Sequence, residues 1–137
     1  MKVYQEIVKI KTKRIYDRIK LTEKLQEIVR RSKIKNGMLF ANALHNTACI
    51  LIQEDDETIF KDLEKVLERI APLKEKYEHD YEGNENATAH QKSMILKTFF
   101  TVPVIDGKLI KGTWQDFWFL ELFEARERKI VVTVIGE

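Results

Sequence analysis

Two apolar runs near the middle of the chain constrain its fold more than any other feature. Gly37 to Leu44 and Ala48 to Gln53 each have the length of a strand, and only three residues separate them. Their nearly continuous apolar character is typical of strands that are buried on both faces. The sequence therefore predicts that both runs lie in the core. A histidine, His45, then ends the first run, and a group of acids follows the second.

Helical patterns flank these runs on both sides. The spacing of Leu25, Ile28 and Val29 predicts a helix that begins at Thr22, whose hydroxyl suits a helix cap. A second helical pattern over residues 60–70 ends before Pro72, because proline cannot continue the hydrogen-bond ladder. A long polar loop follows over residues 73–85, and a short helix is predicted over residues 87–96.

The remaining predicted elements are strands. They cover residues 3–10, 98–104, 108–111, 113–123 and 129–135, with a hairpin turn at residues 106–107. This order is not the strict strand and helix alternation of a doubly wound sheet. It indicates one α+β domain, residues 1–137, with a largely antiparallel sheet or two packed sheets.

The charge of the chain is nearly balanced. Twenty-four Lys and Arg residues against twenty-two Asp and Glu residues give a net charge of +2, and the basic residues are scattered. This balance does not imply nucleic acid as a partner. The one basic run, KIKTKRIYDRIK from Lys9 to Lys20, alternates with Ile and Tyr. The alternation favours a strand with a solvated face over a phosphate-binding arm.

Nothing in the sequence signals secretion or membrane insertion. The chain has no run of about 18 apolar residues, and its first residues lack a long apolar segment. Its single cysteine, Cys49, lies in the apolar run ACILI and fits a small buried side chain better than a reactive thiol. We therefore expect a cytoplasmic protein without a membrane partner.

Only three histidines occur, and each has polar or acidic neighbours. His45 ends a predicted strand, His79 lies in the long polar loop, and His90 lies on the short helix. Neutral imidazoles from separate elements that converge around an open fourth position form the usual catalytic zinc site. Nitrogen ligands suit zinc better than magnesium or calcium. For any single histidine, a structural hydrogen-bonded role is the competing interpretation.

Several acids could support such a site. Glu54, Asp80 or Glu121 would serve as a further ligand, a hydrogen-bond acceptor behind a ligand, or a general base, and the sequence alone does not choose among them. Arg126 and Arg128 are two residues apart, so on a strand both point to one side and could hold a phosphate. A solvent face with ion pairs is the alternative.

Four stretches together span nearly the whole chain: HNTACILIQEDDETIFKD, YEHDYEGNENATAHQKS, DGKLIKGTWQ and EARERKIVVTVIGE. In their order and spacing they resemble the motifs of the YjbQ-like family of secondary thiamine-phosphate synthases. The resemblance implies an α+β domain with a mostly antiparallel β-sandwich and two to three helices. It further implies a homotrimer, a metal site and a weak thiamine-phosphate synthase activity.

The resemblance also assigns roles to individual residues. Metal ligation falls on the histidines: His45, His79 and His90. Catalytic roles fall on three acids: Glu54, Asp62 and Glu121. Substrate binding falls on polar, glycine and arginine positions: Thr47, Asn86, Ser93, Gly112, Thr113, Gln115, Arg126 and Arg128.

The chain departs from the family pattern at three places. Asn46 stands where a hydroxyl residue is usual after the histidine, and Lys97 stands where a glycine is usual after the helix. Phe123, Glu124 and Ala125 replace a segment that usually contains glycine. These changes remove a hydroxyl and alter the backbone freedom beside the expected site.

Two classes of function follow from these patterns. In the first, the protein is an enzyme that joins a hydroxymethylpyrimidine diphosphate to a thiazole phosphate, with a divalent metal, expected to be zinc, or magnesium bound with the diphosphate. A metal-dependent hydrolase of a phosphorylated small molecule is a variant of this class. In the second, the protein is a trimeric metal- or metabolite-binding protein without turnover. An open position at the metal favours an enzyme, whereas a closed four-ligand site favours a structural role.

Overall fold

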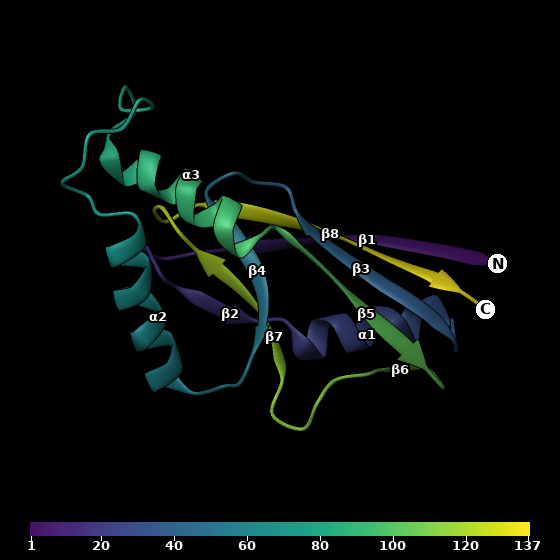
Figure 1. Cartoon of the computed structure of the whole chain (residues 1–137). Coiled ribbons are helices and arrows are strands. Elements are labelled where there is room, and N and C mark those ends of the chain that lie inside the picture. The colour runs from purple at the N-terminus through teal and green to yellow at the C-terminus, as the bar shows by residue number, and fades with distance from the viewer.

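The computed structural model describes all 137 residues (Figure 1). The strands are β1 (Lys2–Lys11), β2 (Arg18–Lys20), β3 (Gly37–Ala43), β4 (Ala48–Gln53), β5 (Phe99–Ile105), β6 (Lys108–Leu109), β7 (Asp116–Glu121) and β8 (Glu127–Gly136). The helices are α1 (Thr22–Ser32), α2 (Glu57–Ile70) and α3 (Asn84–Leu96). The predicted α+β class with three helices is confirmed.

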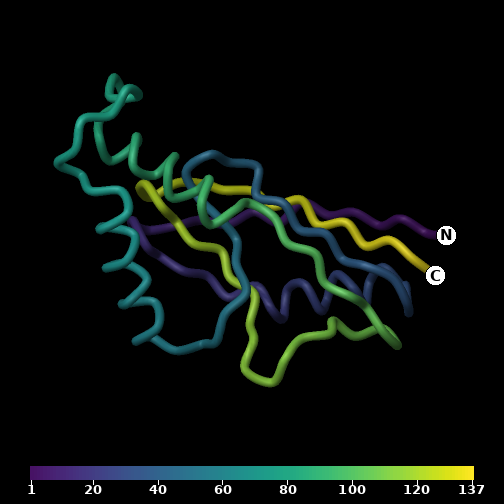
Figure 2. Tube along the Cα trace, viewed as in Figure 1, coloured from purple at the N-terminus to yellow at the C-terminus, as the bar shows by residue number.

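The strands form two sheets in which every pair is antiparallel. The large sheet has the order β1-β8-β3-β5-β6, and the small sheet has the order β2-β7-β4. Strands β1 and β8 pair along their whole length, so Lys2 lies opposite Gly136 and the two chain ends meet (Figure 2). The helices α2 and α3 lie at the other end of the molecule from the two termini (Figure 1).

The core lies between the two sheets and continues beneath α1. Apolar side chains from alternate positions of β3, β5 and β8 meet those of α1 and of the small sheet, such as Ile28, Phe117 and Phe119. On its other face the small sheet packs against α2 and α3 through Leu67 and Leu120. The small sheet is therefore covered on both faces, as predicted for the run that forms β4. The same prediction is wrong for β3, which lies in the large sheet and exposes every second residue, such as Phe40.

Cys49 confirms the interpretation of its apolar run. Its side chain is fully buried between the small sheet and the helices. Burial raises the pKa of its thiol to about 12, so the thiol stays protonated at neutral pH. No helix is both long and apolar enough to cross a membrane.

The outer face of the large sheet carries apolar side chains that no other element covers. Val3, Ile7, Phe40 and Phe99 project from it, and Val3, Ile7 and Phe99 each expose more than half of their surface. Their neighbours across the strands, such as Ile135, are also partly exposed. We call this surface the open sheet face.

Three details differ from the sequence predictions. Thr22 does not cap α1, because the cap position is Leu21 and the Thr22 hydroxyl instead donates to Asp116 Oδ1 at 2.7 Å. The strand predicted from residue 113 begins only at Asp116, because the preceding residues form a turn. The short strand β2 was not predicted, since three residues are too few to show a periodic pattern.

Candidate functional site

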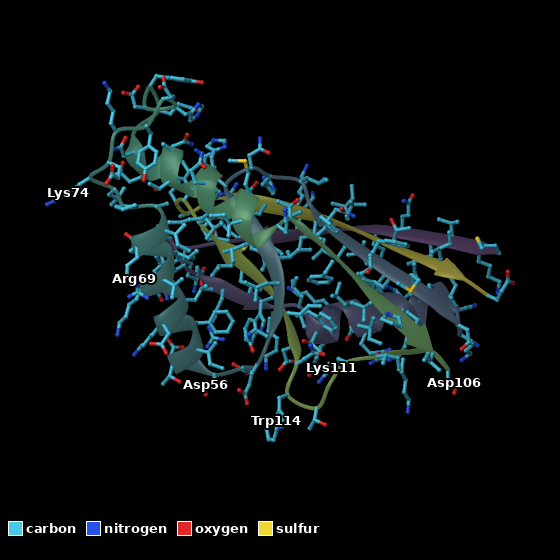
Figure 3. All side chains as sticks on the ribbon, in the orientation of Figure 1. Asp56, Arg69, Lys74, Asp106, Lys111 and Trp114 are labelled. Carbon is cyan, nitrogen blue, oxygen red and sulfur yellow. The ribbon has the colours of Figure 1, made fainter.

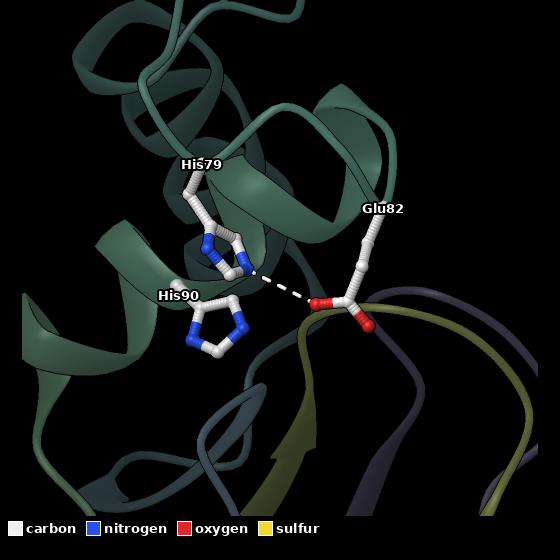
Figure 4. Close-up of side chains that lie close together, drawn as sticks. All are labelled: His79, Glu82 and His90. Atoms are coloured by element: carbon white, nitrogen blue, oxygen red, sulfur yellow. Dashed lines mark hydrogen bonds and ion pairs between the residues drawn. The ribbon is translucent and has the colours of Figure 1, made fainter.

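His79, Glu82 and His90 lie together beside the start of α3 (Figure 4). One ligand atom from each residue lies within 4.8 Å of the others. The two imidazole rings meet edge to face with their centroids 4.8 Å apart, and His79 Nε2 lies 3.1 Å from Glu82 Oε2. All three side chains remain at least partly accessible, so solvent can reach the cluster.

Hydrogen bonds from α3 hold the loop that carries His79. The Asn84 Nδ2 group donates to the carbonyl oxygens of Leu73 and Glu75 at 2.7 Å and 2.9 Å. Gly83 provides a backbone φ of 92°, which allows the chain to turn into the helix. The Oδ1 atom of the buried Asn86 lies 3.2 Å from His79 Nε2, the same ring nitrogen that faces Glu82, and this contact orients the ring.

A buried lysine ties α3 to its surroundings. The ammonium of Lys92 is almost fully covered and donates to Tyr16 Oη at 2.7 Å and to Glu68 Oε2 at 2.8 Å. Tyr16 lies between β1 and β2, and Glu68 lies on α2. This contact therefore fixes the helix that carries His90 against two separate parts of the fold.

The charge state of His90 suits metal binding. Burial and the neighbouring His79 lower the pKa of His90, and the carboxylate of Glu82 only partly opposes them. His90 therefore stays neutral at neutral pH, and a neutral imidazole is the form that binds a metal. Two imidazoles and one carboxylate form a donor set that zinc uses at catalytic sites, with bonds of about 2.0–2.2 Å.

A cavity of about 310 Å³ lies directly beside His90. Its lining combines polar and apolar side chains from α3, from β5 and from the turn before β4: Asn46, His90, Ser93, Met94, Lys97, Thr98 and Phe99. The Ser93 hydroxyl is buried and donates to the carbonyl oxygen of Ala48 at 3.0 Å, so it anchors the helix to β4. A small molecule bound in this cavity could thus contact the cluster of His79, Glu82 and His90 through His90.

Lys97 gives this cavity a strained backbone. Its φ of 76° and ψ of 159° lie in a region that is essentially restricted to glycine. The strain occurs at the position where the family resemblance expects glycine. A lysine at this position places an exposed ammonium group at the cavity, but its backbone conformation is destabilising.

His45 lies apart from the other two histidines, so the predicted cluster of three does not form within one chain. Its Nε2 atom accepts a hydrogen bond from the backbone N–H of Lys129 at 2.7 Å, which fixes its ring at the end of the large sheet. Burial first, and then the positive charge of Arg128, lower the pKa of His45. Glu82, and not His45, completes the cluster of His79 and His90.

Glu121 and Arg128 form a buried ion pair inside the sandwich. Arg128 Nε donates to Glu121 Oε1 at 2.8 Å, and an Nη2 contact joins the same two groups. Glu121 also accepts hydrogen bonds from the Thr12 hydroxyl and the Phe123 N–H, and Arg128 reaches Thr47 Oγ1 at 3.0 Å. These contacts occupy both charged groups, so Glu121 is not a free base and Arg128 is not a free phosphate clamp.

The structure separates Arg126 from Arg128. Arg126 lies just before β8, where the alternation of a strand does not apply, and half of its side chain is exposed. Its guanidinium lies 5.0 Å from the centre of the Phe123 ring and 3.5 Å from Glu124 Oε2. The predicted pairing of the two arginines on one side of the strand is therefore not present.

The other predicted residues lie outside the cluster. Glu54 follows β4 without a side-chain hydrogen bond or ion pair, and Asp62 is exposed on α2. Gly112 and Gln115 close the turn between β6 and β7, where the Gly112 N–H donates to Gln115 Oε1 at 2.8 Å. Thr113 is exposed in the same turn, and Trp114 projects from its tip (Figure 3).

Sequence reasoning missed Glu82. It lies three residues after His79 in the run YEHDYEGNENATAH, and the turn between them brings the two side chains together. The sequence did contain a signal for this contact, because an acid three residues after a histidine can be brought next to it by a turn. Asp80, which is closer in sequence, is exposed and does not belong to the cluster.

Comparison with known proteins places the chain in one family. The family model for the UPF0047 protein YjbQ-like matches residues 6–137. A UPF0047 protein of Methanothermobacter thermautotrophicus is 35% identical over 137 residues, which cover 100% of this chain and 95% of that protein. The UPF0047 protein YjbQ of Escherichia coli O157:H7 is 31% identical and covers 98% of this chain and 99% of its own.

Solved structures of similar chains have the same fold. A YbjQ-like protein of unknown function from Sulfolobus solfataricus superposes with a TM-score of 0.94 at 31% identity, covering 99% of both chains. A hypothetical protein from Aeropyrum pernix gives a TM-score of 0.91 at 26% identity, covering 98% of this chain and 99% of that chain. The resemblance that the sequence motifs indicate is thereby confirmed: the chain belongs to the UPF0047, or YjbQ-like, family.

Proposed function

We propose that this protein is a metal-dependent enzyme that acts on phosphorylated small molecules, with thiamine phosphate as its product. The observation that supports the proposal is the solvent-accessible cluster of His79, Glu82 and His90 beside a cavity. Three protein ligands leave a metal with an open position, and an open position distinguishes catalytic sites from structural ones. Zinc is the metal that these ligands suit best.

Some residues of the proposed site would bind the metal, and another would orient a ligand. His79, Glu82 and His90 would hold the metal, and Asn86 would keep the His79 ring in place. A bound divalent ion supplies positive charge that stabilises a phosphate or diphosphate group during its transfer. The ammonium of Lys97 at the rim of the cavity would add a second positive charge for the same group.

The proposed reaction joins two phosphorylated precursors. The ring nitrogen of the thiazole phosphate attacks the methylene carbon of the hydroxymethylpyrimidine diphosphate, and the carbon–oxygen bond to the diphosphate breaks. The diphosphate leaves with the bonding electron pair, and magnesium bound to it would stabilise its charge. The ring nitrogen carries a positive charge in the product, so no proton needs to be removed and no general base is required.

We also propose that the chain assembles as a homotrimer through the open sheet face. Val3, Ile7 and Phe99 expose more than half of their surface on the outer side of the large sheet, where polar residues such as Gln5 and Thr133 lie among them. Several large apolar side chains exposed on one face favour a contact surface. A closed ring of three identical copies would cover the face in every subunit.

The decisive experiment measures product formation by the purified protein. With zinc and magnesium supplied, the two precursors should yield thiamine phosphate, and His90→Ala should lower the rate by at least roughly tenfold. Gln91→Ala, an exposed neighbour on the same helix, serves as the matched control and should retain the full rate.

Zinc binding without any product after long incubation would remove the transferase proposal. The same result would support the alternative of a metal-binding protein without turnover. Release of inorganic phosphate from either precursor alone would instead support hydrolysis.

A further inference from the structure

A second cavity, of about 320 Å³, lies where β1 ends and β8 begins. Its lining comes from two short segments of these strands: Lys9, Ile10, Lys11, Glu127, Arg128 and Lys129. It shares no lining residue with the cavity beside His90. Two of its lysines belong to the basic run that the sequence alone presents as a solvated face.

The strand register explains why positive charge gathers here. Lys9 lies directly opposite Lys129, and Lys11 lies directly opposite Glu127. Residues two apart on a strand project to the same side, so all four side chains rise from the outer face of the large sheet. They stand at the end of the open sheet face, one step beyond Ile7 and Val131.

The facing pair of lysines is an unfavourable arrangement for an empty surface. Like charges directly opposite each other on antiparallel strands destabilise the sheet. None of Lys9, Lys11 and Lys129 forms an ion pair with any carboxylate of the chain. The charge of these three lysines is therefore left without an ion-pair partner inside the protein.

Buried groups beneath the cavity do not remove this positive charge. Arg128 on its floor is already neutralised by Glu121. Three ammonium groups thus face a single carboxylate, that of Glu127.

We propose that this cavity binds the phosphate group of a small phosphorylated molecule, held by Lys9, Lys11 and Lys129. Lysine ammonium groups are compact point charges with three donors each, and they suit a phosphate. The site is one small basic pocket on a chain of nearly balanced charge, which fits a small anion and not a nucleic acid. The proposal does not rest on the cluster of His79, Glu82 and His90 or on the proposed reaction.

Calorimetry on the whole protein tests the site with three probes: inorganic phosphate, inorganic diphosphate and glycerol 3-phosphate. At low ionic strength at least one probe should bind with a dissociation constant of roughly 1 mM or tighter, and added salt should weaken it. Lys9→Ala combined with Lys129→Ala should weaken binding at least roughly tenfold. The matched control, Lys61→Ala with Lys65→Ala, removes the same charge from the exposed side of α2 and should bind as the wild type does.

A second readout keeps the test independent of ligand choice. Without any anion, the Lys9→Ala, Lys129→Ala variant should unfold at a temperature equal to or above that of the wild type, because the facing charges are gone. Tighter binding of glycerol 3-phosphate than of phosphate would assign the site to an organic phosphate. Equal binding would assign it to the free anion, and both results support the site.

Two results would overturn the proposal. One is the absence of saturable binding of all three probes up to about 10 mM. The other is an equal loss of binding in the Lys61→Ala, Lys65→Ala control, which would show only a general charge effect. Loss of binding in the Lys9→Ala, Lys129→Ala variant together with a lower unfolding temperature would count against it as well, since that pattern indicates damage to the sheet.

Discussion

The imidazole rings of His79 and His90 meet edge to face with their centroids 4.8 Å apart. One ring comes from the loop before α3 and the other from the second turn of that helix, so the loop and the helix together create the pair. Glu82 lies in the turn between them and adds a carboxylate oxygen 3.1 Å from His79 Nε2. The cluster thus comes from one short segment, residues 79–90, whose helix is held in place by Lys92 and Ser93.

The buried pair of Glu121 and Arg128 should dominate the stability of the sandwich end. Arg128→Met leaves the carboxylate of Glu121 buried without its partner, which costs on the order of 3–5 kcal/mol of unfolding free energy. Arg126→Met is the matched control, because that side chain is half exposed and its loss should cost less than about 1 kcal/mol. Urea unfolding measures the loss of unfolding free energy in both variants. Equal losses would contradict the role given to the buried ion pair.

Lys92 should make the stability of the protein depend on pH through Glu68. Burial raises the pKa of Glu68, but hydrogen bonds from Lys92 and Tyr16 outweigh it and leave that pKa below its ordinary value of 4.5. A lowered carboxyl pKa stabilises the fold above pH 4.5, and this contribution disappears as the pH falls through the lowered value.

The corresponding variant is Lys92→Met. It should lose about 1–2 kcal/mol near neutral pH, the lower part of the range for charged hydrogen bonds because Glu68 is partly exposed. The loss should shrink at acid pH, as the pH falls through the lowered pKa and Glu68 becomes protonated in both proteins. Lys61→Met, on the exposed side of α2, controls for removal of a charge. A loss that is the same at both pH values would contradict the role given to Glu68.

Lys97 should be a site of stored strain. Replacing it with glycine removes the Cβ atom that disfavours its φ of 76° and ψ of 159°, so Lys97→Gly should raise the unfolding free energy by about 1–3 kcal/mol. Lys97→Ala keeps the Cβ atom and should give little of this gain. Thermal unfolding compares the two, and an equal effect of both substitutions would mean that the side chain, not the backbone, matters.

The open sheet face should hold the subunits together. Light scattering is expected to give about three times the chain mass of 16.2 kDa for the wild type. Ile7→Lys places a charge on the face, on its edge strand β1, and should shift the assembly towards monomer. Val66→Lys, on the exposed side of α2, should leave the assembly unchanged. A wild type that remains at 16.2 kDa at all concentrations would rule out this assembly.

Much of the fold could be predicted because its elements are long and periodic. The strands β3 and β4, and the helices α1 and α2, follow from apolar spacing alone. The alternation in β7 also places Glu121 correctly on the side of Phe117 and Phe119, inside the sandwich. Its buried partner could not be predicted, because pairing across sheets depends on how the sheets pack.

The arginines show where periodic reasoning ends. Two residues of separation place side chains on one side only within a strand, and β8 begins at Glu127, between Arg126 and Arg128. Only Arg128 therefore lies within the strand, and it is the buried arginine of the two. For the same reason the exposed strand residues Lys9 and Lys129 could not be paired from sequence, since their register is set by the sheet.

The histidines divide in a similar way. His79 and His90 come together through a turn and the start of a helix, which are local features. His45 is placed by the pairing of β3 with β8, and it contacts the Lys129 backbone instead. The presence of three histidines could suggest three metal ligands, but only the fold shows which ligand atoms lie close together.

Zinc binding to the wild type and to single-residue variants tests the central claim most directly. The wild type should bind about one zinc ion per chain near neutral pH, and binding should weaken as the pH falls through the lowered pKa of His90, because a protonated imidazole does not bind a metal. His79→Ala and His90→Ala should abolish tight binding, Glu82→Gln should weaken it, and His45→Ala should bind as the wild type does. Circular dichroism confirms that each variant is folded. The account is contradicted if the wild type binds no zinc near neutral pH, or if His79→Ala and His90→Ala both retain full binding.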